Sequence, residues 1–360
     1  MKKTKFNNKH VALGAKLVEF AGYEMPLQYT SIIGEHKAIR NSVGVFDVSH
    51  MGEVIVKGEK AFDFVQHITI NDVAKLKIGR VQYTAMCYED GGIVDDLLLY
   101  QTGENEYMLV VNASNIEKDL EWMRAQNTFG VEIIDESEEY SLLAVQGPNS
   151  RKTLESICKE AIEMEYYHFV VTECNGVEII VSRTGYTGEL GYEIYFKSNI
   201  EEAEKIWDTI FEAGIKYEIV PVGLGARDTL RLEMGFCLYG NDIDQTTNPI
   251  EAGLGWITKV KIGEFIGRDA ILKIKEDGIK RKLVAIISET KSFPRQGYEI
   301  SENGTIIGTI TSGTLSPILG KPIALGYVDK EYSDIDSILN IKIRNKDVEG
   351  QIVKLPFVRL

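Results

Sequence analysis

Residues 90–100 read Asp-Gly-Gly-Ile-Val-Asp-Asp-Leu-Leu-Leu-Tyr, and they place two adjacent carboxylates in a run that is otherwise typical of a buried strand. The turn-forming residues 90–92 lie between β-like runs at 82–88 and 93–101, so the stretch predicts a β-hairpin. Burying an ionised carboxylate is costly unless it is paired, so one aspartate is expected to anchor the turn while the other faces whatever lies beyond the sheet. From these residues alone, two solvated hairpin charges are an equally good interpretation.

The alternation of the strand separates the roles of these two aspartates. Asp96 shares its face with Leu98 and Tyr100, which form an apolar and aromatic wall suited to a flat ring. Asp95 shares the other face with Ile93, Leu97 and Leu99, which is typical of the packed side of a sheet. We therefore predict that Asp96 carries chemistry and that Asp95 is held by backbone donors of the turn.

Outward from this hairpin, the chain mixes short helices and strands. Apolar periodicity predicts helices at 61–68, 114–126, 149–157, 200–213 and 224–234, and Ser31 is placed to cap a further helix that runs through Arg40. Strand-like runs lie at 45–48, 107–111, 169–173 and 177–183, with turns at 103–105 and at Asn175-Gly176. Regular alternation of strand and helix is missing from the pattern, so an α+β arrangement with antiparallel sheets is favoured over a doubly wound parallel sheet.

The C-terminal part of the sequence has a different character. Runs at 282–288, 305–311, 323–328 and 339–344 are β-like, and no helix-period stretch of useful length separates them. This pattern predicts a separate all-β module at 280–360, which follows a larger α+β body at 1–275. The charged stretch Lys273 to Arg281 is the expected linker.

Composition excludes several classes of partner. With 40 Lys and Arg against 54 Asp and Glu, the net charge of −14 repels nucleic acid and anionic membranes. The apolar stretch 11–15 is too short for a signal sequence, and no run of the sequence is long enough to span a membrane. The four cysteines show no C-x-x-C spacing, so reduced, packed thiols in a cytoplasmic protein are expected. His50 is one of five histidines that lack metal-ligand spacing, so no metal site is expected.

A glycine-rich loop at 183–195 is a candidate ligand site. It follows a strand, carries Tyr186 among three glycines, and re-enters a strand that contains Glu193. A carboxylate accepts two parallel hydrogen bonds from an amino group and an adjacent ring N–H, which is the edge that a pterin or guanine presents. Glycine-rich turns with a tyrosine are also common in structural hairpins, and Glu193 could instead pair with a nearby lysine.

Residues 223–228, Gly-Leu-Gly-Ala-Arg-Asp, resemble a dinucleotide loop only superficially. Position 228 is Asp rather than Gly, and the preceding segment contains Pro221. Helical spacing of Arg227, Leu230 and Arg231 indicates the start of a helix instead. Arg227 either supplies a cation for an anionic ligand or pairs with a carboxylate of the protein.

Eight motifs in register make a larger pattern. They are Asp-Val-Ser-His-Met-Gly-Glu at 47–53, Gln-Tyr-Thr at 82–84, Gly-Gly-Ile-Val-Asp-Asp at 91–96, Asn-Ala-Ser-Asn at 112–115, Gln-Gly-Pro at 146–148, the loop 183–193, Ala-Arg-Asp-Thr-Leu-Arg-Leu-Glu at 226–233 and Leu-Tyr-Gly-Asn-Asp at 238–242. In order and spacing, from Glu19 to Phe357, they resemble the aminomethyltransferase (T-protein) family of the glycine cleavage system. The resemblance implies a tetrahydrofolate-binding body of two interleaved antiparallel α+β subdomains around a central pocket at 1–275, followed by a C-terminal β-barrel domain at 280–360.

The resemblance also implies the reaction. The enzyme of that family is a transferase of one-carbon metabolism and glycine catabolism, which passes the methylene carbon of the aminomethyl group on the dihydrolipoyl arm of the H-protein to tetrahydrofolate. The products are 5,10-methylenetetrahydrofolate, ammonia and the reduced arm. By the same resemblance, Asp96 is the essential carboxylate beside the reacting folate nitrogens, Glu193 accepts from the pterin edge, and Arg227 is a substrate-binding cation. The expected pocket-lining positions are Met51, Tyr83, Tyr100, Val110, Asn112 and Tyr186.

Two other members of the superfamily are competing interpretations. A non-catalytic folate-binding protein of iron–sulfur maintenance carries a Lys-Gly-Cys-Tyr-x-Gly-Gln-Glu signature, whereas this chain has Glu264 where that cysteine would stand. The folate domain of a dimethylglycine or sarcosine oxidase is attached to a flavin domain, and this sequence has no dinucleotide fingerprint. The sequence departs from some relatives at its end, Val358-Arg359-Leu360, where they extend to a substrate-contacting tyrosine.

Overall fold

The computed structural model describes residues 1–290, 292–344 and 346–360. Its contacts divide the chain into two compact units. The first comprises residues 1–65, 73–83 and 97–228, and the second comprises residues 66–72, 84–96 and 229–360. The chain therefore passes repeatedly from one unit to the other, and four elements, α3 (Ala61–Ile68), β5 (Val81–Cys87), β6 (Ile93–Gly103) and α7 (Leu224–Met234), contribute residues to both.

One sheet of the first unit holds the glycine-rich loop. Its order is β10-β11-β12-β9-β3-β13, and neighbouring strands are antiparallel except for β13, which pairs in parallel with β3. The strands are β3 (Gly44–Asp47), β9 (Tyr140–Gln146), β10 (Phe169–Cys174), β11 (Val177–Ser182), β12 (Gly191–Lys197) and β13 (Val220–Pro221). Asn175 and Gly176 turn the β10–β11 hairpin with positive φ angles of 55° and 80°, as the Asn-Gly pair predicts.

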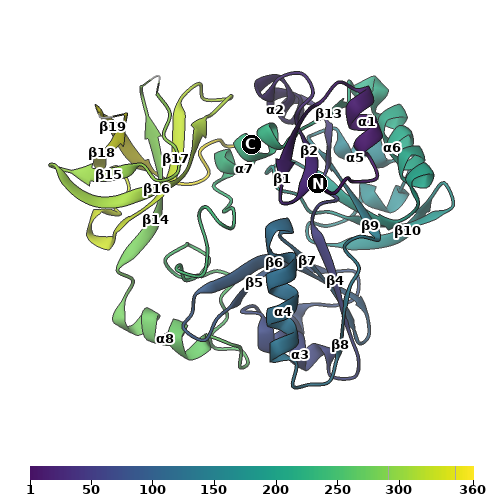
Figure 1. The fold of residues 1–360 in the computed structure, drawn as a ribbon, viewed down its shortest axis with the longest axis horizontal. Helices are drawn as coiled ribbons and strands as arrows, with labels where there is room; N and C mark the ends of the chain where they lie inside the picture. Colours follow the sequence, from purple (N-terminus) through teal and green to yellow (C-terminus); the bar gives the residue numbers. More distant parts are fainter. Residues whose placement is uncertain (291, 345) are drawn as a thin grey trace. The chain divides into compact units, whose positions relative to one another are not determined.

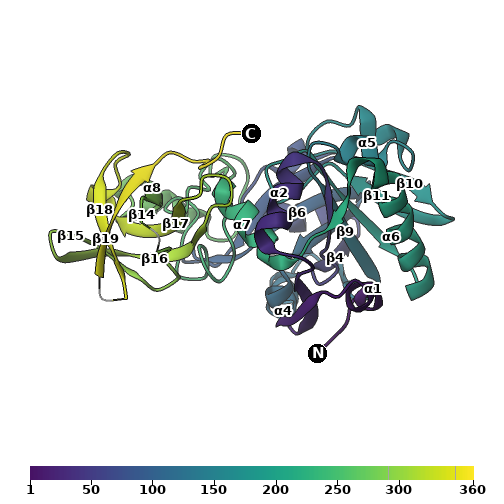
Figure 2. The same cartoon turned by 90° about the horizontal axis from the view of Figure 1, so that it is seen from above.

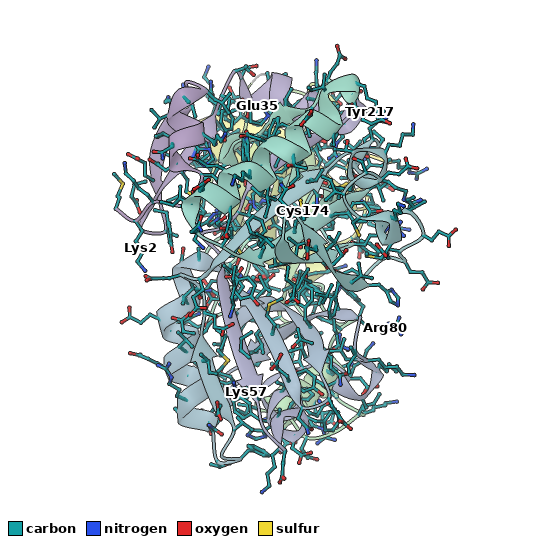
Figure 3. The ribbon with its side chains drawn as sticks, turned by 90° about the vertical axis from the view of Figure 1, so that its right-hand side faces the viewer. Lys2, Glu35, Lys57, Arg80, Cys174 and Tyr217 are labelled. Atoms are coloured by element: carbon teal, nitrogen blue, oxygen red, sulfur yellow. The ribbon has the colours of Figure 1, made fainter. Side chains whose placement is uncertain are left out.

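The second sheet has the order β5-β6-β7-β4-β8. Besides β5 and β6 it contains β4 (Gly52–Lys57), β7 (Glu106–Val111) and β8 (Glu132–Asp135). Glycine shapes its hairpin at 90–92: Gly91 has a φ of +89°, and the Gly92 N–H donates to Asp90 Oδ1 at 3.0 Å. In Figure 3, Cys174 on β10 and Lys57 on β4 mark the two sheets of this unit, and side chains fill the space between them.

Helices cover the outer face of the six-stranded sheet (Figure 2). The long helix is α6 (Ile200–Gly214), which Asn199 and Glu202 start with a reciprocal capping box. Its Ile206, Trp207 and Ile210 join a core with strand residues such as Ile194. The remaining elements of the unit are α1 (Asn7–Ala12), β1 (Lys16–Phe20), β2 (Tyr23–Gln28), α2 (Ile32–Asn41), η1 (Val73–Lys75), η2 (Ala113–Asn115), α4 (Ile116–Gln126), α5 (Ser150–Leu154), η3 (Lys159–Ile162) and η4 (Ile215–Tyr217).

The second unit contains a closed antiparallel barrel, which Figure 1 shows in light green and yellow. Its strand order is β14-β17-β16-β15-β18-β19, so β19 closes the barrel on β14. The strands are β14 (Arg281–Ser288), β15 (Glu299–Glu302), β16 (Thr305–Leu315), β17 (Pro322–Asp329), β18 (Ile338–Ile343) and β19 (Lys346–Val353), with η5 (Lys330–Tyr332) after β17. Aliphatic residues such as Ile286, Ile300 and Ile341 fill its interior.

Most predicted elements are present, and the prediction of an α+β body with antiparallel sheets and a C-terminal barrel is confirmed. The Ser31 side chain caps α2 by accepting from the Gly34 N–H at 3.1 Å. The first half of the expected linker at 273–281 is helical, because α8 (Arg268–Asp277) runs through it. Ile271 is the buried residue of that helix. With one buried apolar residue among many charged ones, the sequence shows too weak a helical periodicity to predict it. The predicted helix at 149–157 is also shorter, since α5 ends at Leu154.

Candidate active site

Glu193 is the centre of a buried polar cluster in the first unit. The register of the six-stranded sheet places it on β12 between Ser182 of β11 and Ala144 of β9. Its side chain is 8% exposed and accepts hydrogen bonds from the hydroxyls of Thr184 (2.5 Å) and Tyr195 (3.3 Å). Among the described residues no lysine, arginine or histidine forms an ion pair with Glu193, so the interpretation that it pairs with a nearby lysine is wrong.

The electrostatics of Glu193 result from two opposing effects. On balance the pKa of its carboxyl group is raised, because burial outweighs the hydrogen bond from Thr184, the charge of Arg227 and the hydrogen bond from Tyr195, which all lower it. Because both hydroxyls donate, they offset part of the cost of ionising this carboxyl group. It presents an acceptor on a buried strand, which is the group that the edge of a pterin requires.

Tyr100 connects this cluster to the other sheet. From β6 its hydroxyl lies 3.0 Å from the Tyr195 hydroxyl and donates to Ser182 Oγ at 3.1 Å. Its ring meets the Tyr195 ring edge-on, with centroids 5.5 Å apart. Burial raises the pKa of the Tyr100 hydroxyl, and the nearby Glu193 acts in the same direction, so the hydroxyl remains a donor. The predicted pocket residue Tyr100 therefore supports Glu193 through a chain of hydroxyl groups.

Arg227 and Tyr186 also come together. The guanidinium of Arg227, on α7, lies 4.8 Å from the centroid of the Tyr186 ring, a cation–π contact that holds both side chains. Burial lowers the pKa of the Arg227 guanidinium, and Tyr186, Glu193 and Tyr195 oppose that shift. Within the described parts of the chain Arg227 forms no ion pair shorter than 4 Å, so it keeps its charge for another anion.

The glycine-rich loop is shaped by Gln146 of β9. A Cβ atom at Gly185 or at Gly191 would lie 2.1 or 2.3 Å from the Gln146 amide, so a side chain at either position would have to displace that amide. The amide donates to the Thr184 carbonyl (3.2 Å) and accepts from the Thr187 hydroxyl (2.9 Å). Two of these glycines therefore have a structural reason, beside the expectation that they let the backbone approach a ligand. They let the loop wrap around Gln146 and fix the direction of Tyr186 and Glu193.

His50 belongs to the same region, although the sequence gave it no role. It is 2% exposed, and its Nδ1 atom has no hydrogen-bond partner among the described residues. Burial lowers the pKa of the imidazole to about 4, and the positive charge of Arg227 lowers it as well. The negative charge of Asp47 has the opposite, smaller effect. The ring packs edge-on against Phe20 at 5.4 Å. His50 is therefore neutral at physiological pH.

The other predicted pocket positions lie on elements of this unit. Val110 is 4% exposed and pairs across the sheet with Leu98 and Glu53, so these three share one face of the sheet. Met51 precedes β4, Tyr83 lies on β5, and Asn112 follows β7, all partly exposed. Hydroxyl and charge contacts join Tyr100, Tyr186, Glu193 and Arg227. The positions of Met51, Tyr83 and Asn112 follow from the strands on which, or next to which, they lie.

Asp95 and Asp96 belong to the second unit. Asp95 is fully buried and Asp96 is partly exposed, as the alternation along β6 predicts. In this unit burial raises the pKa of the Cys237 thiol, and the negative charges of Asp242 and Asp96 add to the effect.

Two of the sequence motifs meet in the second unit as a buried ion pair. Arg231 of α7 is 2% exposed and contacts Asp242 at 2.7 Å and Ser312 Oγ at 2.9 Å. Asp242 also accepts from the Leu238 N–H (2.9 Å) and the Thr311 hydroxyl (2.6 Å). These bonds join α7, the 238–242 motif and the barrel strand β16, so this part of both motifs has a structural role.

The same unit has a polar depression of about 220 Å³. It is lined by Asn241, Asp244, Thr246, Thr247, Arg281, Ile307, Gly308, Thr309, Thr311, Tyr327, Val328 and Asp329. None of the predicted site residues is among the described residues that line it. The described residues contain no group of three or more potential metal ligands, and none of their helices is long and apolar enough to cross a membrane.

Comparison with known proteins assigns the family. Residues 6–262 match the family model described as the GCVT N-terminal domain, and residues 281–359 match the glycine cleavage T-protein C-terminal barrel domain. A protein of Halothermothrix orenii named aminomethyltransferase is 51% identical over 359 residues, covering 99% of this chain and all of the relative. One of Flavobacterium psychrophilum with the same name is 52% identical over 362 residues, covering both chains completely.

A solved structure agrees with these matches. The crystal structure of the glycine cleavage system aminomethyltransferase T from Bartonella henselae superposes with a TM-score of 0.92 at 33% identity, covering 99% of this chain and 98% of that one. The fold and these matches thus define a protein of the aminomethyltransferase class. The chain belongs to the glycine cleavage T-protein family, and the prediction of an aminomethyltransferase is confirmed.

Proposed function

We propose that this aminomethyltransferase uses tetrahydrofolate as its acceptor and that Glu193 recognises the pterin. The observation that carries the proposal is the buried carboxyl of Glu193, with Thr184 and Tyr195 as its hydrogen-bond donors and Arg227 as a nearby cation. The 2-amino group and N3–H of a pterin form a parallel pair of donors that a fixed carboxylate satisfies. Met51, Tyr83, Tyr100, Val110, Asn112 and Tyr186 are the further folate-binding positions in this proposal.

Asp96 is the proposed catalytic carboxylate. N5 of tetrahydrofolate becomes cationic when it attacks the activated methylene, and a fixed carboxylate stabilises that developing charge where little water is present. The same carboxylate is suited to hold N10 for ring closure or to relay a proton. The amino group of the donor arrives protonated and leaves as neutral ammonia, so the reaction needs no dedicated strong acid. Asp96 lies on the face of β6 that also carries Leu98 and Tyr100.

The carbon donor in this proposal is the aminomethyl adduct on the dihydrolipoyl arm of an H-protein. The solved relative is named as part of a glycine cleavage system, and this supports a carrier of that kind. The chain has a net charge of −14, so local basic residues must steer any acidic partner. Turnover with the carrier should therefore fall as salt rises, and turnover on the free dihydrolipoamide adduct should not.

The four cysteines are buried thiols, which supports a cytoplasmic location.

Isothermal titration with 5-formyltetrahydrofolate tests the folate site. Replacing Glu193→Gln should weaken binding by about 1.5–3 kcal/mol, or about 10- to 150-fold, because it removes a charge-assisted acceptor. Glu138→Gln is the matched control, since Glu138 is exposed and pairs with Lys2 at the surface. A dissociation constant unchanged by Glu193→Gln would remove Glu193 from the site. Folate binding without any methylene transfer from a loaded H-protein would favour a non-catalytic folate-binding protein.

A further inference from the structure

A second carboxyl group is buried in the first unit, and the proposed site does not use it. Glu53 lies on β4 and is 1% exposed. Its Oε1 atom has no hydrogen-bond partner among the described residues. An unsatisfied buried carboxyl oxygen costs about 1–3 kcal/mol, and an apolar side chain would avoid that cost. The side chain therefore needs an explanation beyond packing.

Strand register shows which way Glu53 faces. It pairs with Val110 of β7, which in turn pairs with Leu98 of β6, so the three side chains form one row across the sheet. Two residues further along β6, Tyr100 lies on the face that Leu98 shares, and its hydroxyl contacts Tyr195 beside Glu193. Glu53 and Glu193 are thus on inner faces that Tyr100 and Tyr195 connect.

The charges around Glu53 decide which of the two carboxyls keeps its proton. Burial raises the pKa of Glu53 well above its usual value, and the negative charges of Asp135 and Glu193 raise it further, against the weaker opposing effect of Lys5. The other titratable groups whose pKa responds to Glu53 are Lys5, Tyr23, Tyr140 and Tyr195. Glu193 has two hydroxyl donors for its anion and Glu53 Oε1 has none among the described residues, so Glu193 is the first of the two to ionise and Glu53 is the one that keeps its proton.

We propose that Glu53 is a second folate-recognition residue, which donates a hydrogen bond from its carboxyl group to an acceptor of the bound ring. The proposal rests on the folate site described above. A pterin carries the carbonyl O4 directly beside N3–H, so its edge offers two donors followed by one acceptor. The ionised Glu193 satisfies the donors, and a neutral acid supplies the donor that the carbonyl requires. One carboxyl of each protonation state makes the site specific for this edge.

Titration of 5-formyltetrahydrofolate into the full chain at pH 7 tests the proposal. Glu53→Gln keeps a donor and cannot ionise, so it should bind within about threefold of the unmodified protein at pH 7. Glu53→Met keeps the volume without a donor and should bind about 5- to 10-fold more weakly. Glu132→Gln on the neighbouring β8 is the matched control, because its side chain is 70% exposed.

The outcomes separate this inference from the folate site itself. If Glu53→Gln and Glu53→Met both bind folate as tightly as the unmodified protein, Glu53 has no part in recognition, while the effect of Glu193→Gln still stands. Equal weakening by both variants would mean that Glu53 acts through packing rather than by donation, which also refutes the proposal. If Glu53→Met does not fold, Glu53→Leu decides instead, because it also lacks a donor, and an affinity equal to that of Glu53→Gln refutes the proposal. A protein that binds no folate refutes the proposed function instead.

Discussion

Replacing Asp242→Asn should destabilise the second unit strongly, because it removes one charge from a pair that is almost fully buried. Arg231 and Asp242 are 2% and 0% exposed, and their closest atoms are 2.7 Å apart. Removing one partner of such a pair costs about 3–5 kcal/mol, mostly because the other charge stays buried and has lost this partner. The amide oxygen that this substitution introduces would still accept from the Leu238 N–H, which confines most of the loss to the charge.

The magnitude converts into a measurable shift of Tm. The second unit holds about 150 residues, and a domain of that size loses about 2–4 °C per kcal/mol. Differential scanning calorimetry of the full chain should therefore show a transition lowered by about 6–20 °C. The control is Glu299→Gln, which breaks an exposed pair with Lys342 on the same barrel and should cost less than about 1 kcal/mol.

A double-mutant cycle separates charge from packing. Arg231→Met alone leaves the Asp242 carboxylate unpaired and should cost about as much as Asp242→Asn. The double variant buries no charge, so its cost should fall short of the sum of the single variants by about 1.5–3 kcal/mol. The reasoning is refuted if Asp242→Asn shifts Tm no more than Glu299→Gln does, or if the two single effects add.

Three further predictions concern the candidate site and its scaffold. Asp96→Asn should retain the fold and most folate affinity while losing about 10²-fold or more in turnover. Asp95→Asn should instead lower Tm and cost less activity per folded molecule. The reverse pattern in a coupled assay would mean that Asp96 does not face the site. The unfolded chain binds a proton at His50 near pH 6.5, and the folded chain binds it only near pH 4. The free energy of unfolding should therefore fall by about 3 kcal/mol as the pH drops from 6.5 to 4, and this pH dependence should be missing in urea titrations of His50→Asn. Gly185→Ala should displace Gln146 and weaken folate binding without direct contact, so unchanged binding with an unchanged Tm would show that the loop tolerates a Cβ atom there.

Local chemistry predicted the elements with strong signals. The Ser31 cap, the helices Ala61–Ile68 and Leu224–Met234 and the Asn175-Gly176 turn all follow from side chains within a few residues of where they act. Two missed strands of the barrel lack such signals. β15 has four residues, and β19 is charged and carries Gly350, where a Cβ atom would lie 2.7 Å from Ile286 on the neighbouring strand β14. Their strand character comes from closing the barrel, which no local pattern encodes.

Part of the candidate site could also be predicted from the sequence. The family resemblance and the strand pattern led to Glu193, Arg227 and Tyr100, and these three do lie in one cluster of hydroxyl and charge contacts. The sequence could not show why the loop needs its glycines, because the reason is Gln146, about 40 residues earlier in the chain and on a different strand. A contact of that kind depends on sheet order, which hairpin signals alone do not determine.

The role proposed for Glu53 follows from burial rather than from sequence. Its motif, Asp-Val-Ser-His-Met-Gly-Glu, places it two residues after Met51, and in a strand of that length a glutamate is most simply a solvated edge residue. Only the structure shows that it is 1% exposed and on the row of Val110 and Leu98. Two carboxyls that interact without bulk water share their protons unequally, and the one with hydroxyl donors becomes the anion. Thr184 and Tyr195 therefore do more than hold Glu193 in place: by favouring its charged form, they keep the proton on Glu53 and make it the donor.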